Sequence, residues 1–151
     1  MGELLGAEAR AGDVFLLSGE LGAGKTRLAQ GIVRGLGGEE YARSPTFMLV
    51  AQHQGRLTLH HIDLYRLNRR ADIDALGLEE CLFGDGVCVV EWADKAPGLG
   101  PEEHLAIRIE RVNKTTRRLH LAGTGERPAE LIEAVRTAQG RGLQPISAER
   151  E

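Results

Sequence analysis

Hydrophobic and polar positions vary along the chain in a pattern that predicts strands and helices in turn. Residues 14–17 and 87–90 are short, continuous apolar runs, which are typical of strands buried on both faces of a sheet. Residues 26–36 carry apolar side chains at helical spacing and run into a glycine-rich stretch, so we expect a helix there. Residues 46–52 and 57–62 are predicted to form an antiparallel hairpin.

The second half of the chain continues this alternation. Residues 72–83 are mixed in character and are expected to be helical in short pieces. Residues 104–110 and 118–122 alternate apolar and polar side chains, which predicts two strands that pair with each other. Residues 128–138 form an amphipathic pattern with a proline in the first turn, as in a helix. We expect a single α/β domain over residues 1–139, with a mixed, mainly parallel central sheet.

The end of the chain and its overall composition add little to this picture. Residues 140–151 have little apolar content and are expected to be disordered. No apolar run approaches the roughly 20 residues that span a bilayer, and we see no signal-peptide pattern, so we expect a cytoplasmic protein without membrane contact. The two cysteines lie among apolar neighbours and are expected to be reduced, buried thiols.

A glycine-rich loop joins the first expected strand to the first expected helix. It fits the pattern G-x-x-x-x-G-K-[ST], and the strand before it and the helix after it are the context that a P-loop requires. Glycines let backbone N–H groups surround a phosphate, and the helix adds the positive end of its dipole. The sequence therefore predicts a P-loop NTPase three-layer sandwich that binds ATP through Gly19, Glu20, Leu21, Gly22, Ala23, Gly24, Lys25 and Thr26.

Two acids directly follow expected strands and are candidates for the chemistry. Asp63 and Glu91 should meet at the ligand-binding edge of the sheet, because the carboxyl ends of its strands meet there. Either could coordinate Mg²⁺, together with the hydroxyl of Thr26, and either could orient the attacking water. Lys25 would face the β- and γ-phosphates as the third candidate catalytic residue. Thr46, in the run Ser-Pro-Thr-Phe, could supply another hydroxyl to the metal from a switch-like loop.

Charge and histidine placement limit other functions. The formal net charge of −3 argues against a molecule that binds nucleic acid through its overall field. Basic residues gather at 66–70 and 108–118, where we favour a solvated face or phosphate contacts near the nucleotide. His60 and His61 are adjacent on an expected strand, so they should point to opposite faces rather than share a metal.

Together these motifs resemble the TsaE (YjeE) family, the ATPase subunit of bacterial tRNA threonylcarbamoyladenosine (t6A) biosynthesis. The P-loop alone is shared by many families, whereas the Asp-Leu-Tyr-Arg-Leu run combined with the Glu-Trp pair is far more specific. The resemblance covers roughly residues 5–122 and rests on the segments 19–26, 44–47, 61–67 and 91–92.

The resemblance implies a protein that binds and hydrolyses Mg-ATP, slowly when alone. Its partners would be TsaD and TsaB, which modify adenosine 37 of tRNAs reading codons that begin with A; tRNA would be contacted mainly within that complex. Glu91 would be the firmer metal ligand, and Trp92 would lie beside the nucleotide. Arg117 or Arg118 would match a basic residue of the late hairpin, with Arg117 as the candidate nucleotide contact. Because few residues precede the first strand, the family's N-terminal helix beside adenine is expected to be short or missing.

Three other functions stay open at this level. A small-molecule kinase would need an acceptor pocket and a basic lid, for which residues 66–70 are the candidate segment. A GTPase-like switch would need Asn-Lys-x-Asp, whereas residues 113–116 read Asn-Lys-Thr-Thr and favour a turn. A scaffold that binds ATP without turnover would need the same phosphate cradle as a slow ATPase.

Overall fold

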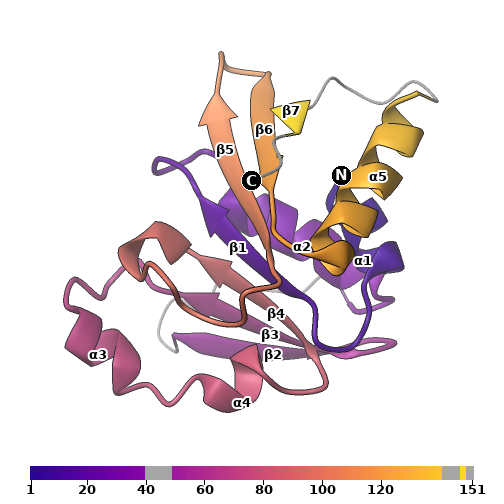
Figure 1. The fold of residues 1–151 in the computed structure, drawn as a ribbon. Helices are drawn as coiled ribbons and strands as arrows, with labels where there is room; N and C mark the ends of the chain where they lie inside the picture. The colour runs from indigo at the N-terminus through magenta and orange to yellow at the C-terminus, as the bar shows by residue number, and fades with distance from the viewer. Residues whose placement is uncertain (40–48, 141–146, 149–151) are drawn as a thin grey trace.

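The structure, a computed structural model, describes residues 1–39, 49–140 and 147–148 (Figure 1). Its centre is a seven-stranded sheet in the order β2-β3-β4-β1-β5-β6-β7. The strands are β1 (Val14–Ser18), β2 (Val50–Gln54), β3 (Thr58–Asp63), β4 (Val87–Glu91), β5 (Leu105–Arg111), β6 (Arg117–Ala122) and β7 (Ser147–Ala148).

Strand directions confirm a mixed, mainly parallel sheet. Four neighbouring pairs are parallel: β1–β4, β1–β5, β3–β4 and β6–β7. The pairs β2–β3 and β5–β6 are the two predicted antiparallel hairpins. Every residue of β4 is buried, as its continuous apolar run predicts for an interior strand.

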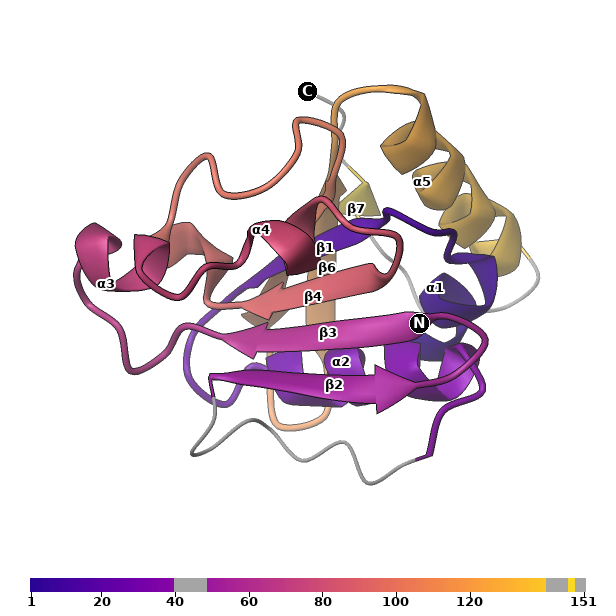
Figure 2. The same ribbon diagram turned by 90° about the horizontal axis from the view of Figure 1, so that it is seen from below.

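Helices cover both faces of the sheet and complete the three predicted layers (Figure 2). Alternate residues of β1 point to opposite layers, since Phe15 and Leu17 join one apolar cluster and Val14 joins the other. The first layer contains α1 (Gly2–Glu8), α2 (Lys25–Gly35) and α5 (Glu126–Gln139), and the second contains α3 (Arg70–Asp74), α4 (Glu79–Leu82) and the 3₁₀ turn η1 (Ala93–Lys95).

Four glycines allow α1 to lie very close to α2. A Cβ on Gly6 would come within 2.8 Å of the Gly35 Cα, and a Cβ on Gly2 would come within 2.8 Å of the Gly31 Cα. Glycines four residues apart on both helices thus form a flat contact between two backbones. The N-terminal helix, which was expected to be short or missing, is present as the seven-residue helix α1.

Most predicted boundaries agree with the structure to within a few residues. Residues 72–83 are helical in two short pieces, and the helix predicted at 128–138 is somewhat longer. The β2 strand begins at Val50, and residues 46–48 of its predicted range lie outside the described residues. The strand β7 falls in the segment 140–151, which was expected to be disordered; residues 141–146 and 149–151 also lie outside the described part.

Two further expectations concern the cysteines and membranes. Both cysteines are free thiols; Cys88 is buried, as predicted, whereas Cys81 is only half-buried. Burial in the layer of α3 and α4 raises the pKa of the Cys88 thiol, which keeps it protonated. Across residues 1–39, 49–140 and 147–148, no helix has the length and apolar character to cross a membrane.

Candidate functional site

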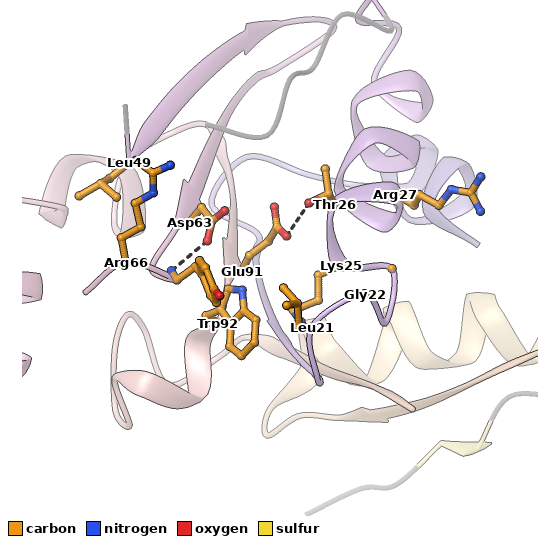
Figure 3. Close-up of a pocket in the computed structure, with 12 residues that line it drawn as sticks. Leu21, Gly22, Lys25, Thr26, Arg27, Leu49, Asp63, Arg66, Glu91 and Trp92 are labelled. Atoms are coloured by element: carbon orange, nitrogen blue, oxygen red, sulfur yellow. Dashed lines mark hydrogen bonds between the residues drawn. The ribbon is translucent and has the colours of Figure 1, made fainter. Parts of the chain in front are cut away.

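A pocket of about 410 Å³ opens where β1, β3 and β4 end (Figure 3). The P-loop forms one wall, and the segments after β3 and β4 form the other. This is the edge at which an open α/β sheet binds its ligands. The residues that line the pocket are Leu21, Gly22, Gly24, Lys25, Thr26, Arg27, Leu49, Asp63, Tyr65, Arg66, Glu91 and Trp92.

The backbone of the P-loop depends on its glycines. Gly19, Gly22 and Gly24 have backbone φ angles of +144°, +80° and +112°, which residues other than glycine rarely adopt. At Gly19, a Cβ would also lie 2.5 Å from the carbonyl oxygen of Ile109 on β5. The loop therefore wraps tightly between β1 and the start of α2.

Lys25 is almost fully buried at the first position of α2. Its ammonium donates to the carbonyl oxygens of Gly19 and Glu20 at 2.5 and 2.8 Å. The Nζ atom also lies 3.9 Å from the centroid of the Trp92 ring. Burial lowers the pKa of Lys25, and nearby carboxylates, Glu91 foremost, oppose that effect by stabilising the charge.

Glu91 is the best-held acid of the pocket. Its Oε1 accepts a hydrogen bond of 2.8 Å from the Thr26 hydroxyl, which joins the end of β4 to the start of α2. Its Oε2 lies 2.5 Å from Nε2 of His61, and both side chains are buried. Asp63 stands beside Glu91 in the β3–β4 register, and its Oδ1 accepts from the Tyr65 backbone amide at 3.0 Å. The two predicted acids are thus brought together (Figure 3).

An aromatic and cationic cluster closes the side of the pocket next to Glu91. Trp92 has a φ of +60°, unusual for a residue with a side chain, and its ring lies 5.1 Å from that of Tyr65. Lys95 donates to the carbonyl oxygens of Tyr65 and Leu67 at 2.5 and 3.3 Å. Lys95 therefore ties the segment after β3 to the turn after β4.

The donors in this pocket suit Mg²⁺ bound together with a phosphate ligand. Thr26, Asp63 and Glu91 offer hard oxygen ligands, which Mg²⁺ prefers over sulfur or nitrogen. Among the described residues, no group of three or more His, Cys, Asp or Glu side chains could hold a metal alone. In general, Mg²⁺ uses one or two protein carboxylates and takes its other ligands from water and phosphate.

Several predicted site residues do not line the pocket: Gly19, Glu20 and Ala23 of the P-loop, and both arginines of the late hairpin. Arg117 lies behind the P-loop, where its Nε donates to the carbonyl oxygen of Ala23 at 2.9 Å. Arg118 faces Glu110 at 3.5 Å on the hairpin, away from the lining residues. Arg117 therefore supports the loop in this structure, and its contact with the nucleotide stays a prediction. Thr46 lies outside the described residues.

Other predictions from single motifs have mixed outcomes. His61 is fully buried and His60 is half-buried, as expected for neighbours on one strand. The segment 113–116 is a turn, in which the Asn113 side chain accepts from two backbone amides. Sequence reasoning missed the hydrogen bond between His61 and Glu91. It also missed the hydrogen bonds from Lys95 to the backbone after β3. The only signal for the first was the histidine two residues before Asp63.

Comparison with known proteins decides the family. The family profile described as "Threonylcarbamoyl adenosine biosynthesis protein TsaE" matches residues 1–119. The chain belongs to the TsaE family. The TsaE protein of Treponema pallidum is 43% identical over 108 residues, which cover 72% of this chain and 80% of that protein. The TsaE protein of Bacillus subtilis is 39% identical over 132 residues, covering 87% and 82%.

The solved structures support the same family and fold. The crystal structure of Bacillus subtilis YdiB superposes with a TM-score of 0.72 at 35% sequence identity. The match covers 91% of this chain and 86% of that one. The predicted α/β fold is therefore confirmed together with the TsaE membership.

Proposed function

We propose that this TsaE protein is a P-loop ATPase that binds Mg-ATP and hydrolyses it slowly in support of tRNA threonylcarbamoylation. The observation that carries this proposal is the 2.8 Å hydrogen bond from the Thr26 hydroxyl to Glu91. It brings the last residue of the P-loop motif to an acid 65 positions later in the chain. A hydroxyl and a carboxylate that meet beside a phosphate cradle are the ligands that P-loop proteins give to Mg²⁺.

Each residue of the pocket has a defined role in this proposal. The amides of the P-loop hold the phosphates, and Lys25 supplies a positive charge to them. Thr26 and Glu91 hold Mg²⁺, which neutralises charge on the β- and γ-phosphates when bound. Asp63, at the mouth of the pocket and beside Glu91, orients the attacking water or completes the metal ligands.

The names of the relatives support the biological context. The Treponema and Bacillus proteins are each called a tRNA threonylcarbamoyladenosine biosynthesis protein. We propose that this chain serves the same pathway with TsaB and TsaD homologues and meets tRNA within that complex. The exposed side chains of Leu21 and Tyr65, 71% and 47% accessible at the pocket rim, are consistent with a partner that covers the site.

The alternative of a small-molecule kinase finds less support. Arg69 and Arg70, part of the candidate lid, form ion pairs with Asp72 and Asp74 on their own segment. Arg70 also donates to the carbonyl oxygen of Pro97 at 2.6 Å. These contacts hold both guanidinium groups next to α3. Residues 66–70 could act as a lid over a γ-phosphate only after these ion pairs and the bond to Pro97 were broken.

ATP turnover by the purified protein tests the proposal, measured alone, with TsaB and TsaD, and with tRNA added. We expect slow basal turnover that the partners stimulate, and tRNA modification that requires Lys25. The variant Lys25→Ala should lose nucleotide binding. At saturating Mg²⁺, Glu91→Ala should keep most of its nucleotide binding, because the P-loop and Lys25 still hold the phosphates, while turnover falls by about 100-fold or more.

A matched control uses an acid outside the pocket. Glu110 lies on β5 and is bonded to His120, so Glu110→Ala should leave turnover unchanged. Turnover that ignores the partners but rises with a small metabolite would favour the kinase. Unchanged turnover in Glu91→Ala would remove that carboxylate from the mechanism, and binding without any turnover would leave a scaffold.

A further inference from the structure

Two buried side chains, Glu91 and His61, and the half-buried His53 form a polar row on the α2 face of the sheet that leads away from the pocket. His61 on β3 contacts Glu91 through Nε2, at 2.5 Å. His53 on β2 lies diagonally beside His61, with 6.3 Å between the ring centroids. The row therefore begins at the Thr26–Glu91 pair and ends at the outer strand β2.

Two ring nitrogens in this row have no hydrogen-bond partner among residues 1–39, 49–140 and 147–148. His61 Nδ1 and His53 Nε2 are both buried from solvent, and neither makes a hydrogen bond within that part of the chain. Leaving a buried polar nitrogen unsatisfied costs about 1–3 kcal/mol, so each such atom calls for a partner. Two unsatisfied nitrogens on neighbouring rings, at this centroid spacing, can be satisfied together by one buried water.

We propose that His61 is a positioning residue that holds the Glu91 carboxylate, with a buried water joining it to His53. Nε2–H of His61 donates to Glu91, and Nδ1 accepts a hydrogen bond from the water, which in turn accepts a hydrogen bond from Nε2–H of His53. With Thr26 on the other carboxylate oxygen, both oxygens of Glu91 have fixed directions. Such outer contacts set the orientation of a metal ligand and typically change metal affinity by 10- to 100-fold.

This inference rests on the proposed Mg-ATP site, so its first test does not use nucleotide. Long-range ¹H–¹⁵N NMR of the nucleotide-free protein reports which nitrogen of His61 carries its proton. We expect a proton on Nε2 and none on Nδ1, and a proton on Nδ1 would overturn the proposal. A crystal structure should show the water within hydrogen-bonding distance of both rings, and an empty space there would remove the bridge.

The second test compares three variants by calorimetry of ADP binding across Mg²⁺ concentrations. His61→Leu removes the hydrogen-bond donor to Glu91. It should raise by about 10- to 100-fold the Mg²⁺ concentration at which half of the Mg²⁺-dependent gain in ADP affinity is reached. His61→Gln places an amide donor near the Nε2 position and should recover most of that loss. The control is His60→Gln, adjacent on β3 but on the opposite face, which should change nothing.

The outcomes separate this inference from the proposed function. Equal Mg²⁺ dependence in His61→Leu and the wild type would overturn the positioning role. Equal losses in the Leu and Gln variants, with lower melting temperatures in both, would mean that His61 only packs the core. If the wild-type protein binds no nucleotide, the proposed function fails, while the proton position on His61 still decides this inference.

Discussion

The Lys25 ammonium lies 3.9 Å from the centre of the Trp92 indole, so the P-loop cation rests against the only tryptophan of the chain. Cations are attracted to indole faces, by about 0.5–2 kcal/mol depending on solvent exposure. Trp92 directly follows Glu91 and takes an unusual left-handed backbone conformation. The contact therefore connects the P-loop with the segment that carries Glu91.

This contact predicts that Trp92 fluorescence reports nucleotide binding. When phosphates enter the P-loop, the Lys25 charge moves toward them and its field at the indole changes. Titration with Mg-ATP should therefore change the emission of the wild-type protein. Lys25→Ala should alter the emission before any ligand is added and should show no response to ligand. A flat wild-type titration, with binding shown by calorimetry, would contradict this arrangement.

The pH dependence of binding follows from the lowered pKa of Lys25. Burial lowers this pKa below 10.5 in the free protein. Bound phosphates favour the protonated form, so nucleotide affinity should fall as pH rises through the lowered pKa, and binding should take up protons below pH 10.5. Calorimetry in two buffers of different ionisation enthalpy measures that uptake, and Lys25→Ala should abolish it.

Protein stability should change with pH in the opposite direction. Because the unfolded state holds its Lys25 proton up to the ordinary pKa of 10.5, it binds more protons than the folded state between the lowered pKa and that value. The contribution of this group to folding stability should therefore rise with pH across this window and stay constant below it. Denaturant unfolding of the wild type and Lys25→Met across the window isolates this contribution.

The predictable parts of the site are those with local signals. The P-loop was found from eight consecutive residues with a strand before them and a helix after them, and both acids from their places at strand ends. The bond from His61 to Glu91 joins residues 30 positions apart, and that from Arg117 to Ala23 joins residues 94 apart. Such contacts depend on how neighbouring strands line up, which no local pattern specifies.

Arg117 was predicted to contact the nucleotide, and in the structure it also supports the P-loop. Its substitution tests how much that support contributes to nucleotide binding. Its bond to the Ala23 carbonyl holds the P-loop against the β5–β6 hairpin. Arg117→Ala should weaken nucleotide binding by about five- to tenfold, since a hydrogen bond from a charged group contributes about 1.5–3 kcal/mol and exposure reduces it. Calorimetry of ADP binding measures this effect.

The neighbouring Arg118 supplies a matched control. Its guanidinium is half-exposed and faces Glu110 on the solvent side of the hairpin. An exposed ion pair contributes about 0–1 kcal/mol to stability, so Arg118→Ala should leave affinity unchanged. Equal losses in the two variants would point to the overall charge of the hairpin rather than to the bond with Ala23.

The glycine contact between α1 and α2 predicts a large effect on stability from one methyl group. A Cβ on Gly6 would lie 2.2 Å from the Ile32 carbonyl oxygen, and one on Gly35 would lie 2.2 Å from that of Glu3. Because both obstacles are backbone atoms, the helices must separate. Each alanine variant should cost about 1–3 kcal/mol and lower the melting temperature by several degrees. Gly140→Ala, whose Cβ would make only ordinary contacts, is the control.

Nucleotide binding by the same variants tests whether the packing of α1 against α2 affects the pocket. No residue of α1 lines it, and Lys25 is the first residue of α2 whereas Gly35 is the last. Separation of the helices should therefore leave the P-loop in place, with nucleotide affinity unchanged in Gly35→Ala well below its melting temperature. Weaker binding by the folded variant would show that α1 supports the nucleotide site through α2, and the short N-terminal helix would then have a functional as well as a structural role.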